Sequence, residues 1–291
     1  MSNLGRDKLW TPEVWAEIDK AVMAEVGRLR VSQKVFPTLQ TPNAPNVSAD
    51  VFNRQTMTIQ EGITLPFMEI SVEFALTQSQ VDNESMLRTG RTLAQFAARS
   101  VALAEDLLFF QGAQAPVPQG VRVTNIASAG PGLLNLPGAL QAIAVNPLAQ
   151  GGGYGESTFA AVSQGIGALT AAGHPGPYAL ILEATLFADT HAPVPNTLTT
   201  TADRINPLVE GRFYSTGTLP ANRGLLVSLG GNPTTIYIAQ EAITAYTQED
   251  QQGNYRFRVF ERVQLVAREG QACLSLQFQP AGAQQQAQPG N

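Results

Sequence analysis

One long amphipathic segment, residues 89–112, constrains the fold of this chain more than any other stretch. Its mostly apolar residues recur at steps of three and four in two adjacent stripes: Leu93, Ala97, Val101, Ala104 and Leu108, and Phe96, Ser100, Leu103, Leu107 and Phe110. This spacing predicts a helix with one broad apolar face that ends at Gly112. Arg91, Gln95 and Arg99 lie on the opposite face. About 20 residues at ~1.5 Å rise give a rod of roughly 30 Å, around which a core can form.

The segments before this helix predict further helix and strand. Residues 11–31 carry an apolar stripe at helical spacing and predict a first helix, with Pro12 at its start. Residues 51–60 and 65–76 read as strands, and with a turn at 61–62 they predict a long hairpin. A two-stranded hairpin is marginal alone in water, so it needs a surface to lie on, and a neighbouring subunit is a reasonable candidate.

The segments after it predict short elements with no internal repeat. Residues 77–88 predict a short helix that leads into the long one, and the alanine-rich residues 159–172 predict another. Residues 191–204 predict a polar loop. Strand-like runs occur at 121–128, 176–185, 223–229, 234–239, 255–266 and 273–278. The tail, residues 281–291, lacks large apolar side chains and is predicted to be disordered.

The low charge of the chain bears on its partners. Charged residues make up only 14% of the 291 residues, against about 25% in typical soluble domains. Such a chain either stays weakly solvated or hides much of its surface in subunit contacts, and the second option fits a large assembly. The net charge of −5 provides no basic field for nucleic acid. Since no apolar run reaches about 18 residues and no signal peptide is apparent, we expect a cytoplasmic protein that binds neither membrane nor nucleic acid.

The sequence contains no recognisable catalytic or metal-binding motif. The glycine-rich residues 151–158 carry no lysine for a phosphate, and neither a G-x-S-x-G elbow nor an H-E-x-x-H pair occurs. The single cysteine, Cys273, excludes an intrachain disulfide and is expected to be a small buried residue. Glu105 and Asp106 are adjacent on one helix and do not face each other, so we expect a solvated or subunit-contacting face, not catalytic acids. We therefore expect no enzyme and no metal site.

Several short motifs occur in a fixed order along the chain. They are W-A-E-I-D at 15–19, L-P-F-M-E-I at 65–70, V-D-N at 81–83, A-E-D through F-F-Q-G at 104–112, G-P-Y at 176–178, and Q-E with a later tyrosine at 240–246. Each motif is weak alone. Together, in this order and spacing, they resemble the encapsulins, bacterial nanocompartment shell proteins of the linocin type with the HK97 phage-capsid fold. The resemblance covers residues 4–278.

The resemblance implies an α+β fold of the HK97 capsid type. Residues 1–35 would form an N-terminal helix that faces the lumen, and residues 36–75 an extended E-loop that lies across a neighbour. Residues 76–119 and 226–280 would form the P-domain around a long spine helix, and residues 120–225 the A-domain near the symmetry axes. An icosahedral number of copies would self-assemble into a hollow, virus-like shell.

The resemblance also implies where cargo binds. In the family, the N-terminal helix and the P-domain form an apolar groove for a short C-terminal peptide of cargo enzymes, such as a dye-decolourising peroxidase or a ferritin-like protein. Trp15, Ile18 and Val22 would line this groove, or they would merely fix the helix to the spine helix. His191 and Asn196 would line a pore at the five-fold axis.

One departure from the family pattern concerns cofactors. Some encapsulins carry an aromatic residue before the L-D-N motif that stacks on a bound flavin. Here Ser79 stands at that position with Gln80 beside it, so we expect no flavin and no other cofactor. The resemblance leaves one alternative function, a phage or prophage major capsid protein of the same fold that packages DNA.

Overall fold

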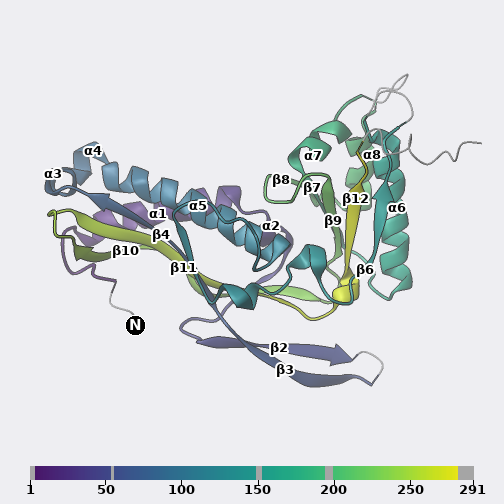
Figure 1. Cartoon of the computed structure of the whole chain (residues 1–291), viewed down its shortest axis with the longest axis horizontal. Coiled ribbons are helices and arrows are strands. Elements are labelled where there is room, and N and C mark those ends of the chain that lie inside the picture. The colour runs from purple at the N-terminus through teal and green to yellow at the C-terminus, as the bar shows by residue number, and fades with distance from the viewer. Residues whose placement is uncertain (1–3, 54–55, 149–152, 194–198, 281–291) are drawn as a thin grey trace, which may run out of the picture. The chain divides into compact units, whose positions relative to one another are not determined.

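The computed structural model describes residues 4–53, 56–148, 153–193 and 199–280. The chain forms two compact units, which are described separately (Figure 1). The first comprises Met1–Gly130 and Thr235–Val266, and the second comprises Pro131–Thr234 and Ala267–Asn291. The tail that was predicted to be disordered, residues 281–291, lies outside the described residues.

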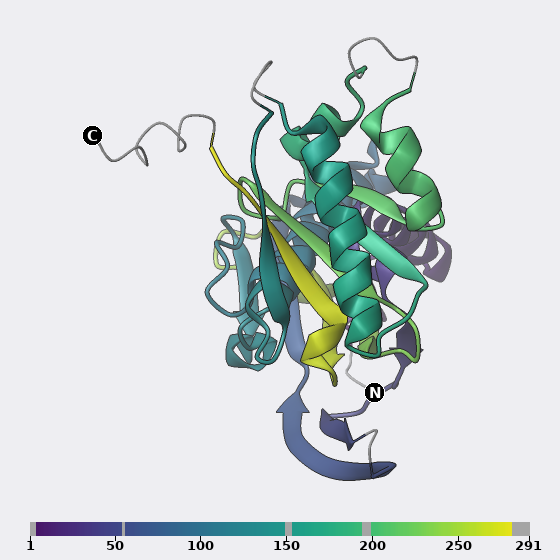
Figure 2. The same ribbon diagram turned by 90° about the vertical axis from the view of Figure 1, so that its right-hand side faces the viewer.

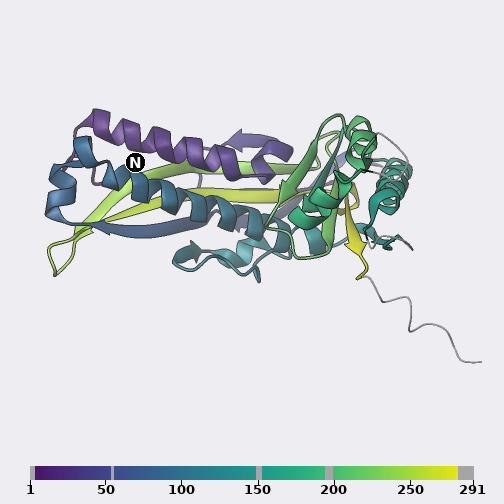
Figure 3. The same ribbon diagram turned by 90° about the horizontal axis from the view of Figure 1, so that it is seen from above.

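In the first unit, two long helices lie side by side on one face of a five-stranded sheet (Figure 3). They are α1, Pro12–Leu29, and α5, Thr89–Gln111, so both predicted long helices are confirmed. The strand order is β1-β10-β11-β4-β5, with bounds Thr38–Gln40, Thr234–Glu249, Tyr255–Ala267, Met68–Leu76 and Val121–Thr124. Strand β1 is parallel to β10, whereas β4 is antiparallel to both β11 and β5. Three short helices connect these elements: α2, Ser32–Val35; α3, Gln78–Asp82; and α4, Glu84–Leu87.

Helix α5 packs on both α1 and β4. Ala97, Val101 and Leu108, from the first predicted stripe, are buried. The second predicted stripe is only partly covered, because Phe96 is exposed. Strand β11 turns alternate residues toward the helices, as a pleated strand does. One of these inward residues, Glu261, is a buried carboxylate.

A hairpin exists and the strand predicted at 65–76 is confirmed as β4, but the predicted pairing and turn are wrong. It consists of β2, Asn46–Asn53, and β3, Thr58–Pro66, while β4 belongs to the main sheet. Gly62, placed in the predicted turn, lies inside β3 opposite a register shift in β2. A Cβ at this position would lie 1.6 Å from the carbonyl oxygen of Ala49. The glycine therefore permits a close backbone approach at a bulge and does not form a turn.

The second unit is a five-stranded sheet with helix α6 along one face (Figure 2). The strand order is β6-β12-β9-β7-β8, with bounds Leu140–Val145, Cys273–Phe278, Arg223–Ser228, Tyr178–Glu183 and Phe213–Thr216. Its helices are α6, Gly155–Ala171; α7, Ala184–Thr190; and α8, Thr201–Leu208. Short 3-10 turns cover Ile126–Ala129 at the end of the first unit and Leu133–Asn135 and Gly270–Ala272 in the second.

The predictions for the second unit were partly correct. The helix predicted at 159–172 and the strands predicted at 176–185, 223–229 and 273–278 are confirmed as α6, β7, β9 and β12. Helix α8 begins inside the predicted polar loop 191–204, where Thr200 and Asp203 form a capping box. Strand β12, which the resemblance assigned to the P-domain, pairs with β6 and β9 and so lies in the second unit.

Candidate functional site

The three candidate groove residues lie on the inner face of α1. Trp15, Ile18 and Val22 are 3%, 1% and 0% exposed. Their spacing of three and four residues places them on one stripe, and α1 packs along α5. In the chain as it stands, these side chains fix α1 in the first unit, which is one of the two roles that the sequence left open. A peptide that contacts Trp15 must first displace what covers it.

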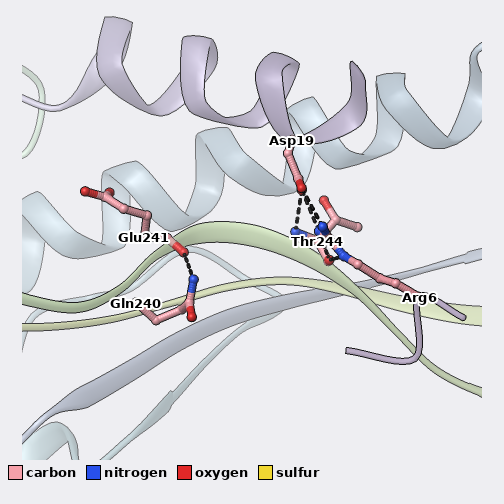
Figure 4. Close-up of polar contacts among 5 residues, drawn as sticks. All are labelled: Arg6, Asp19, Gln240, Glu241 and Thr244. Carbon is pink, nitrogen blue, oxygen red and sulfur yellow. Dashed lines mark hydrogen bonds and ion pairs between the residues drawn. The ribbon is translucent and has the colours of Figure 1, made fainter. Parts of the chain in front are cut away.

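The cover is the segment Leu4–Trp10, which we call the N-terminal strap. Arg6 donates two hydrogen bonds of 2.7 Å to the carboxylate of Asp19 on α1 (Figure 4). It also donates to the carbonyl oxygen of Thr244 on β10, at 3.1 and 2.5 Å. Its guanidinium carbon lies 5.0 Å from the centroid of the Trp15 ring. One side chain thus ties the strap to both α1 and β10 and lies over Trp15.

Trp10, at the end of the strap, fills an aromatic pocket. Its ring stacks on Phe257 with centroids 4.9 Å apart and meets Trp15 edge-on at 4.8 Å. Its Nε1 donates a hydrogen bond of 2.9 Å to the carbonyl oxygen of Val81. Gly90 makes room for the ring, because a Cβ there would lie 2.8 Å from Cη2 of Trp10. Sequence analysis missed the strap because the segment has no periodicity, and only the tryptophan just before the first helix hinted at it.

A buried charge cluster lies where α1 ends. Arg30 contacts Glu105 on α5 at 2.7 Å and also Glu261 on β11, and all three side chains are almost fully buried. Asp106, also buried, accepts hydrogen bonds of 2.8 and 3.0 Å from the two backbone amides that begin α2. The prediction that Glu105 and Asp106 form a solvated or subunit-contacting face is wrong. Their partners come from elements distant in the sequence, so helix periodicity could not reveal them.

Burial decides the protonation of this cluster. Desolvation raises the pKa of Glu105 to about 7; the positive charge of Arg30 opposes the shift, and the negative charge of Asp106 adds to it. Arg30 is shared with Glu261, so one guanidinium cannot offset the burial of every carboxylate. Desolvation also raises the pKa of Asp106. Because the cluster is closed to solvent, we assign it to the linkage of α1, α5 and β11, not to catalysis.

The hairpin exposes an apolar face that no described residue covers. Val51 and Ile63 are 49% and 72% exposed. The register shift sets Glu61 and Gly62 opposite Asp50, which interrupts the alternation of β3. Through their partners on β2, Ile63 and Leu65 lie on the same side as Val51, whereas Ile59, Glu61 and Thr64 lie on the other side. We call the side formed by Val51, Ile63 and Leu65 the hairpin apolar face.

A cavity of about 410 Å³ opens on the sheet of the first unit. Its lining includes Arg258, Phe260 and Arg262, which alternate along β11 with the residues that face the helices. Arg258 contacts Glu69 at 2.8 Å. Arg262 lies 6.0 Å from the ring of Phe67 and donates a long hydrogen bond, 3.4 Å, to a backbone carbonyl. Two guanidinium groups beside two phenyl rings suit a carboxylate that is flanked by apolar side chains.

Of the two candidate pore residues, only His191 is described, and Asn196 lies outside the described residues. His191 follows the last turn of α7 and is exposed. Its Nδ1 lies 2.9 Å from the carbonyl oxygen of Phe187, and its ring lies parallel to that of Phe213 with centroids 6.2 Å apart. The assignment of these two residues to a pore therefore stays a prediction.

The residues considered for cofactors and metals have structural roles. Ser79 and Gln80 lie in α3, where Gln80 completes a capping box with Thr77. Cys273 is fully buried, as predicted, and burial raises its pKa to about 12. Within the described ranges, no group of three or more His, Cys, Asp or Glu side chains could hold a metal ion. None of the described helices combines the length and apolar character needed to cross a membrane.

Comparison with known proteins places the chain in a family. The family model Linocin_M18, described as an encapsulating protein for peroxidase, matches residues 1–264. The fold is similar to a virus-like particle from Pyrococcus furiosus, with a TM-score of 0.68 at 12% identity, covering 90% of this chain and 99% of that chain.

Two further solved structures share the fold. The SrpI encapsulin of Synechococcus elongatus gives a TM-score of 0.54 at 10% identity, covering 82% of this chain and 84% of that chain. A structure from Mycobacterium phage Bobi gives a TM-score of 0.60 at 14% identity, with 87% and 91% covered. The fold is thus the HK97-like capsid fold that the resemblance implied. Because the family model spans most of the sequence, the chain belongs to the linocin-type encapsulins, a family of encapsulating shell proteins.

Proposed function

We propose that the chain self-assembles into an icosahedral shell, a cytoplasmic nanocompartment that encloses cargo enzymes. The subunit itself has no catalytic role, and any chemistry belongs to the cargo. Membership of a family of encapsulating proteins and a fold shared with a virus-like particle support this proposal. In this arrangement the hairpin is the E-loop, the first unit carries the P-domain, and the second unit is the A-domain.

The hairpin apolar face is the observation that carries the assembly proposal. Val51 and Ile63 leave much of their surface in water, although burying one such side chain stabilises a protein by about 1.5–3 kcal/mol. A two-stranded hairpin is also marginal without support. A neighbouring copy that covers this face would remove both penalties.

The contact would join the hairpin apolar face of one copy to a different surface of its neighbour. A contact between different surfaces of identical subunits closes into rings, as an icosahedral shell requires.

Lysine substitution on the hairpin tests the assembly proposal. Val51→Lys with Ile63→Lys should prevent particle formation, because two charges would have to be buried at the contact. The matched control is Ile59→Lys with Thr64→Lys, which adds the same charge to the other side of the hairpin and should leave particles intact. Negative-stain electron microscopy and size-exclusion chromatography give the readout. Normal particles from the first variant would contradict the proposal.

Cargo binding is proposed beside α1. Trp15, Ile18 and Val22 would form the inner wall of the groove, and a C-terminal peptide of a peroxidase or ferritin-like enzyme would occupy it. His191 and Asn196 would line a pore for small molecules at the five-fold axis. Co-expression tests the cargo assignment: an enzyme with its C-terminal peptide should sediment with the particles, and the same enzyme without it should not.

A DNA-packaging capsid is the second candidate, favoured by the fold shared with the phage structure. Nuclease treatment of purified particles separates the two functions. Particles whose ultraviolet absorbance spectrum is that of protein alone support the cargo shell. DNA that is protected from nuclease inside the particles would favour the capsid.

A further inference from the structure

The N-terminal strap occupies the place that a bound peptide would take. We infer that the groove beneath the strap is a peptide-binding site, that the strap fills it in cis, and that a peptide with a basic side chain followed by an aromatic or large apolar one displaces it. The inference rests on the proposed function, since such a peptide would belong to a cargo protein.

The strap is held by the kinds of contact that receptors use for peptides. Its backbone meets the edge of the sheet at one point, where the carbonyl oxygen of Leu4 accepts a hydrogen bond of 3.0 Å from the amide of Tyr246. Arg6 forms a two-pronged ion pair with Asp19. Trp10 inserts into the aromatic pocket of Phe257. One backbone hydrogen bond, a bidentate ion pair and one aromatic anchor together define a peptide with a basic residue four positions before an aromatic one.

The strap leaves two buried polar atoms beneath it without a partner. Among the described residues, neither Trp15 Nε1 nor Thr244 Oγ1 forms a hydrogen bond, although the two residues are 3% and 0% exposed. Buried polar groups are normally satisfied, and an unsatisfied one destabilises the folded state. A peptide that offers a carbonyl oxygen to Trp15 Nε1 would bind this groove more completely than the strap does.

The strap is also strained at one residue. Leu9 has a φ of 77°, in the left-handed region that side chains other than glycine rarely adopt. The neighbouring Asp7 and Lys8 are exposed, so the strap is held mainly through Arg6 on one side of Leu9 and Trp10 on the other. Release of the strap would relax this backbone, which favours exchange with an unstrained peptide.

Binding of the strap sequence in trans tests the inference on assembled particles. The probe is a fluorescent peptide with the sequence of residues 4–12, LGRDKLWTP. Particles of the native chain should not bind it, whereas particles of a chain that begins at Thr11 should, with at least tenfold higher affinity by fluorescence anisotropy. A peptide with Arg6→Glu and Trp10→Ala should lose that binding. Truncated particles that form but ignore the probe would overturn the inference while leaving the shell function intact.

A second measurement covers the case in which the truncated chain fails to fold. In full-length particles, Arg6→Ala should speed hydrogen exchange at the Tyr246 amide at least tenfold, because that amide is protected by the strap. Asp7→Ala is the matched control and should leave the exchange rate unchanged. Unchanged exchange in Arg6→Ala would show that the ion pair does not hold the strap closed and would overturn the inference.

Discussion

Glu105→Gln should change the pH dependence of stability, because Glu105 is buried in the charge cluster at the end of α1. Its pKa is raised from 4.5 to about 7 by desolvation. A raised pKa in the folded state means that the stability linked to neutral Glu105 is fully present below about pH 4.5 and is lost as the pH rises through 7. At about 1.4 kcal/mol for each pH unit between the two values, the loss is about 3 kcal/mol.

The measurement is the difference in melting temperature between Glu105→Gln and the native chain, followed from about pH 5 to about pH 8. Glutamine has the same shape and cannot ionise, so the difference should shift in favour of the variant by roughly 6 °C over this range, at ~2 °C per kcal/mol for a chain of this size. Subunit contacts contribute equally to both proteins and cancel. Glu73→Gln, at an exposed position on β4, is the control for the same substitution outside the buried cluster. A flat difference for Glu105→Gln would refute the argument that burial outweighs the charge of Arg30.

Four further substitutions or treatments test other parts of the structure. Asp106→Asn should lower the free energy of unfolding by about 1–3 kcal/mol in denaturant titration, because an amide accepts hydrogen bonds from the backbone more weakly than a carboxylate; an unchanged midpoint would contradict this. Gly62→Ala should disperse the particles seen by electron microscopy, because its Cβ would meet the carbonyl oxygen of Ala49 at the bulge. Trp15→Ala should lower the free energy of unfolding by about 3–5 kcal/mol, so loss of cargo in this variant must be judged against its melting temperature. Cys273 should resist alkylation in folded particles at about pH 8, since burial raises its pKa to about 12, and should react after unfolding; labelling of native particles detected by mass spectrometry would contradict its burial.

The helices of the first unit could be predicted because their periodicity is local. The stripe through Val101 and Leu108 repeats at helical spacing and is the face that α5 buries. The strand pairing could not be predicted in the same way. The alternation of residues 65–76 identified β4, but its partner β11 follows far along the chain, and the nearer strand was chosen instead. Gly62 was predicted to form a turn. A glycine is needed there because the backbone of Ala49 on β2 comes close at the bulge, and this approach cannot be seen in the sequence.

The candidate site shows the same division between local and distant information. Trp15, Ile18 and Val22 were identified from a local motif, and they do lie on one face of α1. The strap over Trp15 could not be predicted from the sequence. Arg6 is held in place by Asp19 and by the carbonyl oxygen of Thr244 on β10, and β10 lies far away in the sequence. The prediction for Glu105 and Asp106 failed for the same reason. Glu105 is paired with Arg30, and Asp106 accepts hydrogen bonds from the backbone amides of Val31 and Ser32, all distant in the sequence.

The order in which the strands of the first sheet are made has a consequence for synthesis of the protein. Strand β4 ends at Leu76, but its central partner β11 begins at Tyr255, roughly 180 residues later. At ~5–20 residues per second, the ribosome completes this partner roughly 10 to 40 s after β4 emerges. During that interval Trp15 lacks Phe257 and Arg30 lacks Glu261, so neither the aromatic pocket nor the charge cluster can close. The sheet of the first unit is thus completed only after β11 has been made, which delays association of subunits until then and protects shorter chains from being built into a shell.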